Sequence, residues 1–238
     1  MPAPFYAFGT SHVLVLGITT VIACLLLTGR RRKHRWPHSA ESVLGWAVFA
    51  AHFLALLGWL ASGIPLTWEN ALPMHLCNWA GFAVWMALVF RNPTAAELAW
   101  FWAMAGTLQG LITPNQPFDW PHPSFFTFFL LHAGVVAGAI HAVFGMGLKP
   151  RAGAVWRGIL WTEFYLLVAA GVNFLSGANY AFLRAKPAQA SLMDHLGPWP
   201  WYLVSLQLIG IPLYFLLALP FRSQSTASSA PSIRSRDA

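Results

Sequence analysis

Seven long apolar runs constrain the fold of this chain more than any other feature of its sequence. Each run approaches the roughly 20 residues that an α-helix needs to cross the hydrocarbon core of a bilayer. A backbone inside lipid must satisfy its own hydrogen bonds, and runs this long do so as helices rather than as barrel strands. The sequence therefore predicts an all-α, polytopic membrane protein with seven spans near 11–28, 43–61, 73–90, 97–113, 125–144, 156–176 and 199–219.

The composition agrees with this fold and leaves no room for a separate soluble domain. Of the 238 residues, 57% are hydrophobic and only 9% are charged, which is far from the average of soluble proteins. We expect one seven-helix transmembrane domain over 1–221. The segment 222–238 is rich in Ser, Ala, Thr and Arg without an apolar face, so we expect a disordered cytoplasmic tail. Any chemistry must then take place within the bundle or at its ends.

The positive charge indicates topology rather than binding of nucleic acid. The net charge is +7, but Lys and Arg are spread over the segments that flank the spans. Only Arg184 and Lys186 of the 14 Lys and Arg residues fall on the side opposite the basic cluster at 30–35. The positive-inside rule then predicts an N-out, C-in orientation with an uncleaved first span. We expect a location in the plasma membrane, which in a bacterium is the inner membrane.

The sharpest chemical signal is a thiol between an imidazole and an amide, in the run His75-Leu76-Cys77-Asn78. Polar groups are costly inside hydrocarbon and usually face a cavity or a partner helix. At the helical rise, Cys77 lies about one and a half turns inside its span, about 7 Å below the outer boundary. His132 of another span lies about 10 Å below that boundary. His75 is two positions from Cys77 and points to another face of a helix, so His132 is the better-matched base.

A thiol and an imidazole in contact predict nucleophilic catalysis. The histidine takes the thiol proton, and the resulting thiolate attacks an acyl ester. Side-chain amides at a similar depth can donate to the oxyanion, and the absence of Asp and Glu at this depth favours a dyad over a triad. The predicted catalytic pair is Cys77 and His132. The residues predicted to hold the oxyanion or the substrate are His75, Asn78, Gln109, Asn173, Asn179 and Tyr180.

Several motifs together resemble those of the bacterial YwaF-type integral membrane proteins, over nearly the whole chain except the tail. They are LPMHLCN at 72–78, LQGLITP at 108–114, PHPSFF at 121–126, GANYAFL at 177–183 and GPWPWY at 197–202. That group is similar to the eukaryotic transmembrane protein 164 family, and more distantly to the androgen-induced-protein hydrolases. The resemblance implies an intramembrane lipid acyltransferase or lipid ester hydrolase. By motif position it also implies Cys77 as nucleophile and His132 as base.

Other interpretations of the same residues stay open. A single intramembrane Cys is often a small buried hydrophobe, and a His in a bundle often bridges helices, which fits a non-enzymatic bundle that binds or transports a lipid. A third possibility is a zinc-dependent hydrolase whose ligands would be His12, His75 and His132.

Glu163 lies about 20 Å from the outer edge, so we expect it not to reach Cys77. It should pair with His141 or His52, or stay neutral. The leading hypothesis requires no cofactor or metal, and its partners are membrane lipids as acyl donor and acceptor, not nucleic acid.

Overall fold

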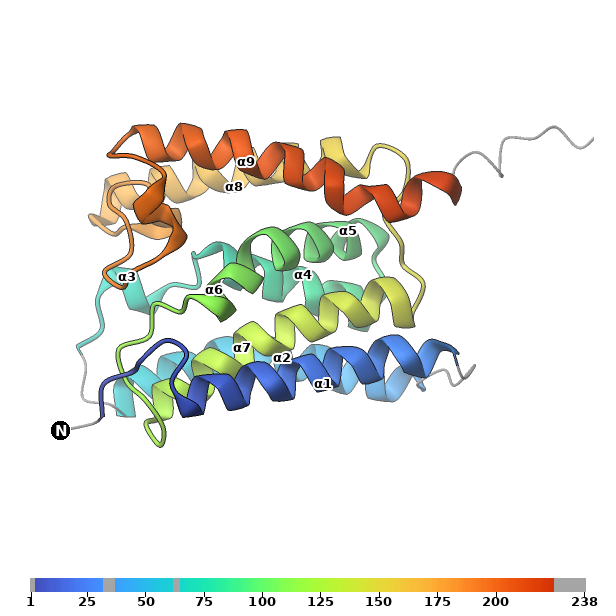
Figure 1. The fold of residues 1–238 in the computed structure, drawn as a ribbon, viewed down its shortest axis with the longest axis horizontal. Coiled ribbons are helices and arrows are strands. Elements are labelled where there is room, and N and C mark those ends of the chain that lie inside the picture. The colour runs from blue at the N-terminus through green and yellow to red at the C-terminus, as the bar shows by residue number, and fades with distance from the viewer. Residues whose placement is uncertain (1–2, 32–36, 62–64, 225–238) are drawn as a thin grey trace, which may run out of the picture.

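The computed structural model describes residues 3–31, 37–61 and 65–224, and within these ranges the ordered elements are helices. The strand pairing of the described residues is limited to one isolated antiparallel bridge, between Pro4 and Phe118. Figure 1 shows the long helices side by side with their axes close to one direction. The helices are α1 (Thr10–Arg31), α2 (His38–Ala61), α3 (Trp68–Ala71), α4 (Leu76–Phe90), α5 (Pro93–Trp102), α6 (Leu108–Ile112), α7 (Pro123–Ile140), α8 (Ala154–Ser176) and α9 (Trp201–Ala218).

Six helical segments of the described residues are long and apolar enough to cross a membrane. The prediction of an all-α, multi-pass membrane protein is therefore confirmed. The segment expected to be the fourth span is helical as well, but it consists of three consecutive pieces. These are α5, a π-helical turn at Ala103–Thr107, and α6. A π turn changes the register of a helix and often marks a functional site.

Small residues hold the central helices together. α4 packs against α5, and α2 and α7 pack against α4. Within a membrane, helix association depends on close van der Waals packing, which small side chains permit. The fully buried alanines of this core are Ala51, Ala80, Ala87, Ala96, Ala99, Ala103, Ala139 and Ala142.

The α8–α9 hairpin forms a further layer on the side of α5 (Figure 1). Phe101 stacks on Tyr214 of α9 with ring centroids 4.7 Å apart. Trp102 donates a hydrogen bond of 2.8 Å to Thr162 of α8. The opposite faces of both helices carry large exposed apolar side chains such as Phe174, which is 89% exposed. An exposed apolar surface of this extent is typical of a face that contacts lipid.

Two buried carboxylates anchor the end of the bundle opposite α3. Glu97 of α5 is fully buried and accepts from Arg151 Nε at 2.7 Å and from Arg157 Nε at 2.8 Å. These hydrogen bonds raise the pKa of the Arg151 guanidinium, which therefore stays charged. Glu41 of α2 pairs in the same way with Arg91. Paired in this manner, the acids join helices instead of destabilising them.

The chain remains helical a little beyond the predicted end of the transmembrane domain. A 3₁₀ segment, Leu219–Gln224, continues α9 across the predicted boundary at residue 221. The rest of that predicted tail, 225–238, lies outside the described residues, as does 32–36, which holds part of the basic cluster used for the topology prediction.

Candidate functional site

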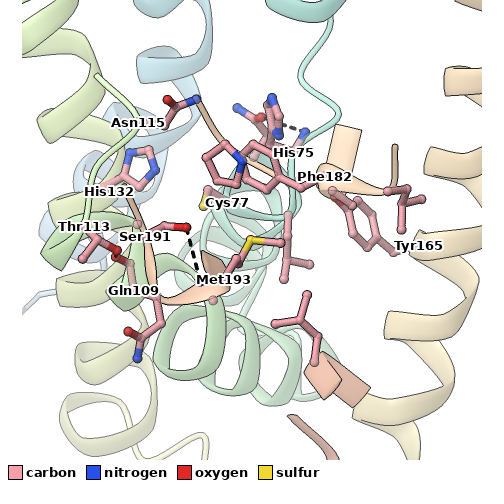
Figure 2. Close-up of a pocket in the computed structure, with 18 of the residues that line it drawn as sticks. His75, Cys77, Gln109, Thr113, Asn115, His132, Tyr165, Phe182, Ser191 and Met193 are labelled. Atoms are coloured by element: carbon pink, nitrogen blue, oxygen red, sulfur yellow. Dashed lines mark hydrogen bonds between the residues drawn. The ribbon is translucent and has the colours of Figure 1, made fainter. Parts of the chain in front are cut away.

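A cavity of about 1390 Å³ lies inside the bundle toward the α3 end. Side chains from α2, α4, α6, α7, α8 and α9 line it, and the loop between α8 and α9 covers it with Ser191 and Met193 (Figure 2). Pockets for small molecules usually measure about 300–1,000 Å³. This cavity exceeds that range and is lined mainly by apolar residues, which suits a lipid chain.

Cys77 is the second residue of α4, because this helix begins at Leu76 with His75 as its N-cap. The prediction that Cys77 lies more than one turn inside its helix is therefore wrong. The first N–H groups of a helix have no partner within it, and the helix dipole favours negative charge at this end. The thiol has the Thr107 hydroxyl and its own backbone N–H as hydrogen-bonding neighbours. Both groups can donate to an atom that gains negative charge.

His132 lies on α7, where Phe128, one turn earlier, holds its ring by two contacts. Its Nδ1 is 2.8 Å from the Phe128 carbonyl oxygen, and the two rings stack with centroids 3.9 Å apart. A carbonyl oxygen only accepts hydrogen bonds, so Nδ1 carries the proton and the neutral ring presents Nε2 as a base. The backbone thus orients this histidine without an Asp or Glu.

Gly110 of α6 lies against both groups. A Cβ atom at this glycine would be 3.4 Å from His132 Nε2 and 3.8 Å from the Cys77 sulfur. The sulfur and the nitrogen are therefore no farther apart than the sum of these distances, which is close to the roughly 6 Å that two hydrogen bonds through one water span. The hydrogen bonds found among the described residues do not join the two directly, and such bonds often tighten only when substrate binds. Figure 2 shows both side chains at the same part of the cavity.

His75 lines the same cavity, in a conformation that the sequence did not predict. As an N-cap it has extended backbone angles, φ −73° and ψ 152°, so the helical argument that turned it away from Cys77 does not apply. Its ring packs against Tyr180 at 5.0 Å and Phe182 at 5.7 Å. It also lies close enough to His132 for the two rings to interact electrostatically. A thiol and two imidazoles therefore share one region of the cavity.

The residues predicted to hold the oxyanion or the substrate divide into two groups. His75, Asn78 and Gln109 line the cavity. The Asn78 side chain accepts from the His75 backbone N–H at 3.1 Å and so helps to cap α4. The amide of Gln109 points away from Cys77 in Figure 2. The prediction places these amides beside the thiol as oxyanion donors, but neither amide is directed at the thiol.

Asn173, Asn179 and Tyr180 instead hold the loop that follows α8. Asn173 donates to the Tyr180 carbonyl at 2.9 Å and accepts from its N–H at 2.7 Å, while Asn179 bonds within the same loop. The Tyr180 hydroxyl contacts the carbonyl oxygens of Trp68 and Leu72, and burial raises its pKa. These three residues fix the loop against α3 and are not among the residues that line the cavity.

Three residues of the site were not predicted: Thr107, Gly110 and Tyr165. Tyr165 of α8 is 1% exposed, interacts electrostatically with Cys77, and donates to the Met74 carbonyl at 3.1 Å. Thr107 ends the π turn that precedes α6. Gly110 could have been recognised in the sequence, because a small residue within an apolar span often marks the close approach of two helices. Nothing local in the sequence distinguishes Thr107 or Tyr165 from ordinary packing residues.

Glu163 lines the same cavity as Cys77, and the prediction that it does not reach Cys77 stays a prediction. Its carboxylate accepts from the Gln207 amide of α9 at 2.8 Å, in place of a histidine. The two predicted partners have other neighbours: His141 lies 3.6 Å from Glu41, and His52 Nε2 lies 3.0 Å from the Asn78 carbonyl oxygen.

The contacts of His12 argue against the predicted zinc ligand set. The Phe8 N–H donates to His12 Nδ1 at 2.8 Å, so Nε2 carries the proton and donates to the Leu111 carbonyl at 2.9 Å. Backbone groups therefore use both nitrogens, and His12 does not join His75 and His132. The part of the chain that the structure describes holds no group of three His, Cys, Asp or Glu residues arranged to bind a metal.

The fold and the cavity define an all-helical, multi-pass membrane protein in which a thiol and two imidazoles line an internal apolar chamber. The sequence model of the TMEM164 family matches residues 7–218, and the chain belongs to this family. An "Uncharacterized protein" of Treponema pallidum (strain Nichols) is 26% identical over 228 residues, which cover 92% of this chain and 90% of that protein. No solved structure matches the chain. The predicted relation to the transmembrane protein 164 family is confirmed, and the YwaF-type description stays a prediction.

Proposed function

We propose that this protein is a lipid acyltransferase, or with water as acceptor a lipid ester hydrolase, in which Cys77 is the nucleophile and His132 the base. The observation that carries the proposal is that the Cys77 sulfur and His132 Nε2 both lie against Gly110, on the wall of a lipid-sized cavity. Membership of the TMEM164 family supports it, because the resemblance in sequence implies acyl transfer between phospholipids.

In the first half-reaction, His132 Nε2 takes the thiol proton and the Cys77 sulfur attacks the ester carbonyl carbon of a donor lipid. A C–S bond forms as the ester C–O bond breaks, and the imidazolium returns its proton to the departing alcohol oxygen. The products are a thioester on Cys77 and a lysolipid. The oxyanion develops beside the first turn of α4, where the Cys77 N–H and the Thr107 hydroxyl are the donors,. These groups take the place of the predicted side-chain amides.

In the second half-reaction, the hydroxyl of an acceptor lysolipid gives its proton to His132 and its oxygen attacks the thioester. The C–S bond breaks as the new ester C–O bond forms, and the Cys77 sulfur recovers the proton from the imidazolium. A water molecule in the acceptor's place releases a free fatty acid.

The proposed function also specifies topology. All seven helical segments span the membrane, with the α5–α6 segment as the fourth, and the orientation is N-out, C-in. Arg91, Arg151 and Arg157 then lie at the cytoplasmic end, while Arg184 follows α8 at the outer end. The cavity thus opens in the outer leaflet, in a bacterium that of the inner membrane, at a depth where lipid ester carbonyls are close.

The test is acyl transfer by the purified protein in lipid nanodiscs, with a phospholipid labelled in its acyl chain and an unlabelled lysophospholipid. The wild type should move label to the acceptor, and a labelled thioester that hydroxylamine cleaves should accumulate when the acceptor is omitted. Cys77→Ser and Cys77→Ala should lose both signals. Undiminished transfer by both variants would remove the thiol from the mechanism.

A bundle that binds or transports a lipid without catalysis is the second candidate, favoured by the volume of the cavity. In that case labelled lipid binds equally to the wild type and to Cys77→Ala, and neither protein forms labelled product. The same two proteins therefore separate the two functions.

A further inference from the structure

We infer that the cavity consists of two lipid grooves that meet at Cys77: one holds the acyl chain attached to the sulfur, and the other holds the glycerolipid that gives up or receives this chain. The inference rests on the proposed acyl transfer and assigns its substrates to places. The α2 groove is lined by Phe53, Leu56, Trp59, Phe82 and Leu131. The α8–α9 groove is lined by Ile159, Leu166, Leu203, Leu206 and Gly210.

The first argument is volume. The cavity measures about 1390 Å³, whereas a pocket for one ligand usually measures about 300–1,000 Å³. A reaction that holds a covalent acyl chain while a second lipid enters needs room for both molecules at once. The volume of this cavity meets that need.

The second argument is that the two linings belong to separate parts of the bundle. α2 packs against α4 and α7, whereas α8 packs against α9 and α5. Figure 1 shows α2 and the α8–α9 hairpin on opposite sides of the central helices. The α2 groove and the α8–α9 groove therefore lie on different sides of α4, and one cavity connects them.

The third argument is the place of Cys77 on α4. Successive residues of a helix are rotated by about 100°. Gly81 and Phe82 face α2, since a Cβ at Gly81 would be 2.6 Å from the His52 ring, which stacks on Phe82 at 4.3 Å. Trp79 faces α8, where its ring lies 5.1 Å from that of Tyr165. On α4, Cys77 lies about 40° from Gly81 and about 160° from Trp79. Its neighbours nevertheless come from both sides of the helix. Gly110 lies against it together with His132 of α7, and Tyr165 of α8 is close enough to interact with it electrostatically. Cys77 is therefore accessible from both grooves.

The fourth argument is that the two grooves differ in polarity. The polar side chains of the α2 groove include His52 and Thr127. Both ring nitrogens of His52 lie at backbone carbonyl oxygens and its ring is covered by Phe82. The Thr127 hydroxyl lies against Gly58 of α2 and donates to the Ser124 carbonyl at 3.3 Å. What remains for a ligand is an apolar and aromatic surface, which fits a hydrocarbon chain.

The α8–α9 groove contains polar groups that a lipid backbone can use. Glu163 and Gln207 form a hydrogen-bonded pair of 2.8 Å on its wall, and a polar pair at this depth is costly unless it serves a function. The covering loop adds Gln189, Ser191 and His195 to the lining of the cavity. Hydroxyl, ester and headgroup atoms of a lysophospholipid match these donors and acceptors, so the glycerolipid belongs here.

This arrangement explains how one nucleophile serves two lipids in turn. The acyl chain stays in the α2 groove as a thioester, while the first lysolipid leaves the α8–α9 groove and the acceptor replaces it. The thioester carbon stays beside His132 throughout, and the same base serves both half-reactions.

The first experiment measures occupancy without catalysis, in a Cys77→Ala background. Native mass spectrometry should find one palmitate and one 1-palmitoyl-lysophosphatidylcholine bound to the same protein molecule. Leu56→Trp fills the α2 groove and should remove the palmitate alone, whereas Leu206→Trp fills the α8–α9 groove and should remove the lysolipid alone. Leu57→Trp and Leu208→Trp are matched controls, because these neighbours are 57% and 70% exposed on the outer faces of the same helices. Ligands that compete for one place, or a single tryptophan that displaces both, would overturn the inference.

The second experiment measures the two half-reactions separately in the Cys77 protein. A nitrophenyl palmitate acylates the thiol with a small leaving group, so its burst of nitrophenol requires the α2 groove alone. Leu56→Trp should slow this burst about tenfold and leave that of nitrophenyl butyrate unchanged. Leu206→Trp should keep the palmitate burst and slow transfer from Cys77 to lysophosphatidylcholine about tenfold. Equal effects of both variants on both steps would contradict two grooves. A wild type without any burst would contradict the proposed function, and the occupancy measurement would still decide the grooves.

Discussion

Two buried polar clusters lie toward opposite ends of this bundle, and they differ in what surrounds them. At the end away from α3, Glu97 is fully buried and both of its carboxylate oxygens accept hydrogen bonds from Arg151 and Arg157. Toward the α3 end, Cys77 and His132 line a large cavity. Their contacts within the protein orient them and leave the sulfur and Nε2 directed at open space.

The difference shows how polar residues that stabilise the fold of an apolar chain can be distinguished from polar residues that take part in a reaction. Burial of a charge is tolerated when partners from the protein match it, and such a cluster needs nothing further. A polar group that faces a cavity inside a membrane lacks a protein partner, so the free energy of its desolvation is not offset until a ligand binds. Such groups are therefore usually functional. Substitutions at the Glu97 cluster should therefore change stability, and substitutions at the cavity should change activity.

The largest effect on activity should come from Cys77→Ala. Loss of the nucleophile should reduce labelled acyl transfer to background, with a midpoint of thermal unfolding close to that of the wild type. Cys24→Ala is the matched control, because Cys24 is the other of the two cysteines and lies exposed on α1. If Cys24→Ala lost activity and Cys77→Ala kept it, the comparison of the two clusters would fail.

His132→Gln should lower the rate of acyl transfer by about 10²–10⁴-fold, the usual contribution of a general base. The thiol remains in place but loses the group that accepts its proton, so alkylation of Cys77 by iodoacetamide should slow as well. The measurement is the rate of transfer together with the rate of Cys77 labelling. Labelling at the wild-type rate would show that His132 does not act on the thiol.

Glu97→Gln should destabilise the fold by about 1–3 kcal/mol, because Arg151 and Arg157, which are partly exposed, lose the buried carboxylate that they share,. Thermal unfolding in detergent measures this loss. Glu163→Gln is the control, with an expected change below about 1 kcal/mol, since its partner Gln207 is neutral and can bond to an amide equally well,. A larger loss at Glu163 than at Glu97 would reverse the assignment of the two clusters.

Gly110→Ala should slow acyl transfer about tenfold without unfolding the protein. The new methyl group would lie 3.3 Å from His132 Cδ2 and 3.8 Å from the Cys77 sulfur, so it would occupy the space in which the two groups and the ester meet. Gly171→Ala on α8 is the control, because a Cβ there has nothing within 4 Å. Equal activity of both variants would place the reaction away from Gly110.

The smallest effect should come from Thr107→Val, with a decrease of a few-fold in the rate of transfer. This change removes the hydroxyl beside the thiol and keeps the shape of the side chain. Thr107→Ser should restore the rate, because it returns the hydroxyl without the methyl group. An unchanged rate in Thr107→Val would leave the backbone N–H groups of α4 as the oxyanion donors.

Much of the fold follows from local properties of the chain. The length of an apolar run determines whether it can be a membrane helix, so six of the predicted spans coincide with long apolar helices except at their ends. The fourth is divided into α5, a π turn and α6, and the short helix α3 lies outside the predicted spans. Cys77 and His132 were also recognisable, because a thiol and an imidazole are rare within hydrocarbon. Gly110 was recognisable as a small residue that allows a close approach, although the sequence does not show which side chains approach it.

The errors share one cause. Counting residues along a helix gives a depth within that helix, but says nothing of where a neighbouring helix begins or how far it is displaced along the bundle. α4 begins at Leu76, after a loop that enters the bundle, so Cys77 lies in a first helical turn. Asn173 has a suitable depth, yet its hydrogen bonds go to the loop at Tyr180.

The sequence by itself therefore determined that this protein is a membrane-spanning helical bundle and which two side chains carry its most unusual chemistry, because hydropathy and residue type are properties of the chain alone. Only the tertiary structure decided that the sulfur and the imidazole lie against one glycine, that one large cavity reaches them, and that Glu97 is satisfied where Glu163 faces that cavity. These relations depend on the offset and rotation of packed helices, which contacts among distant residues set.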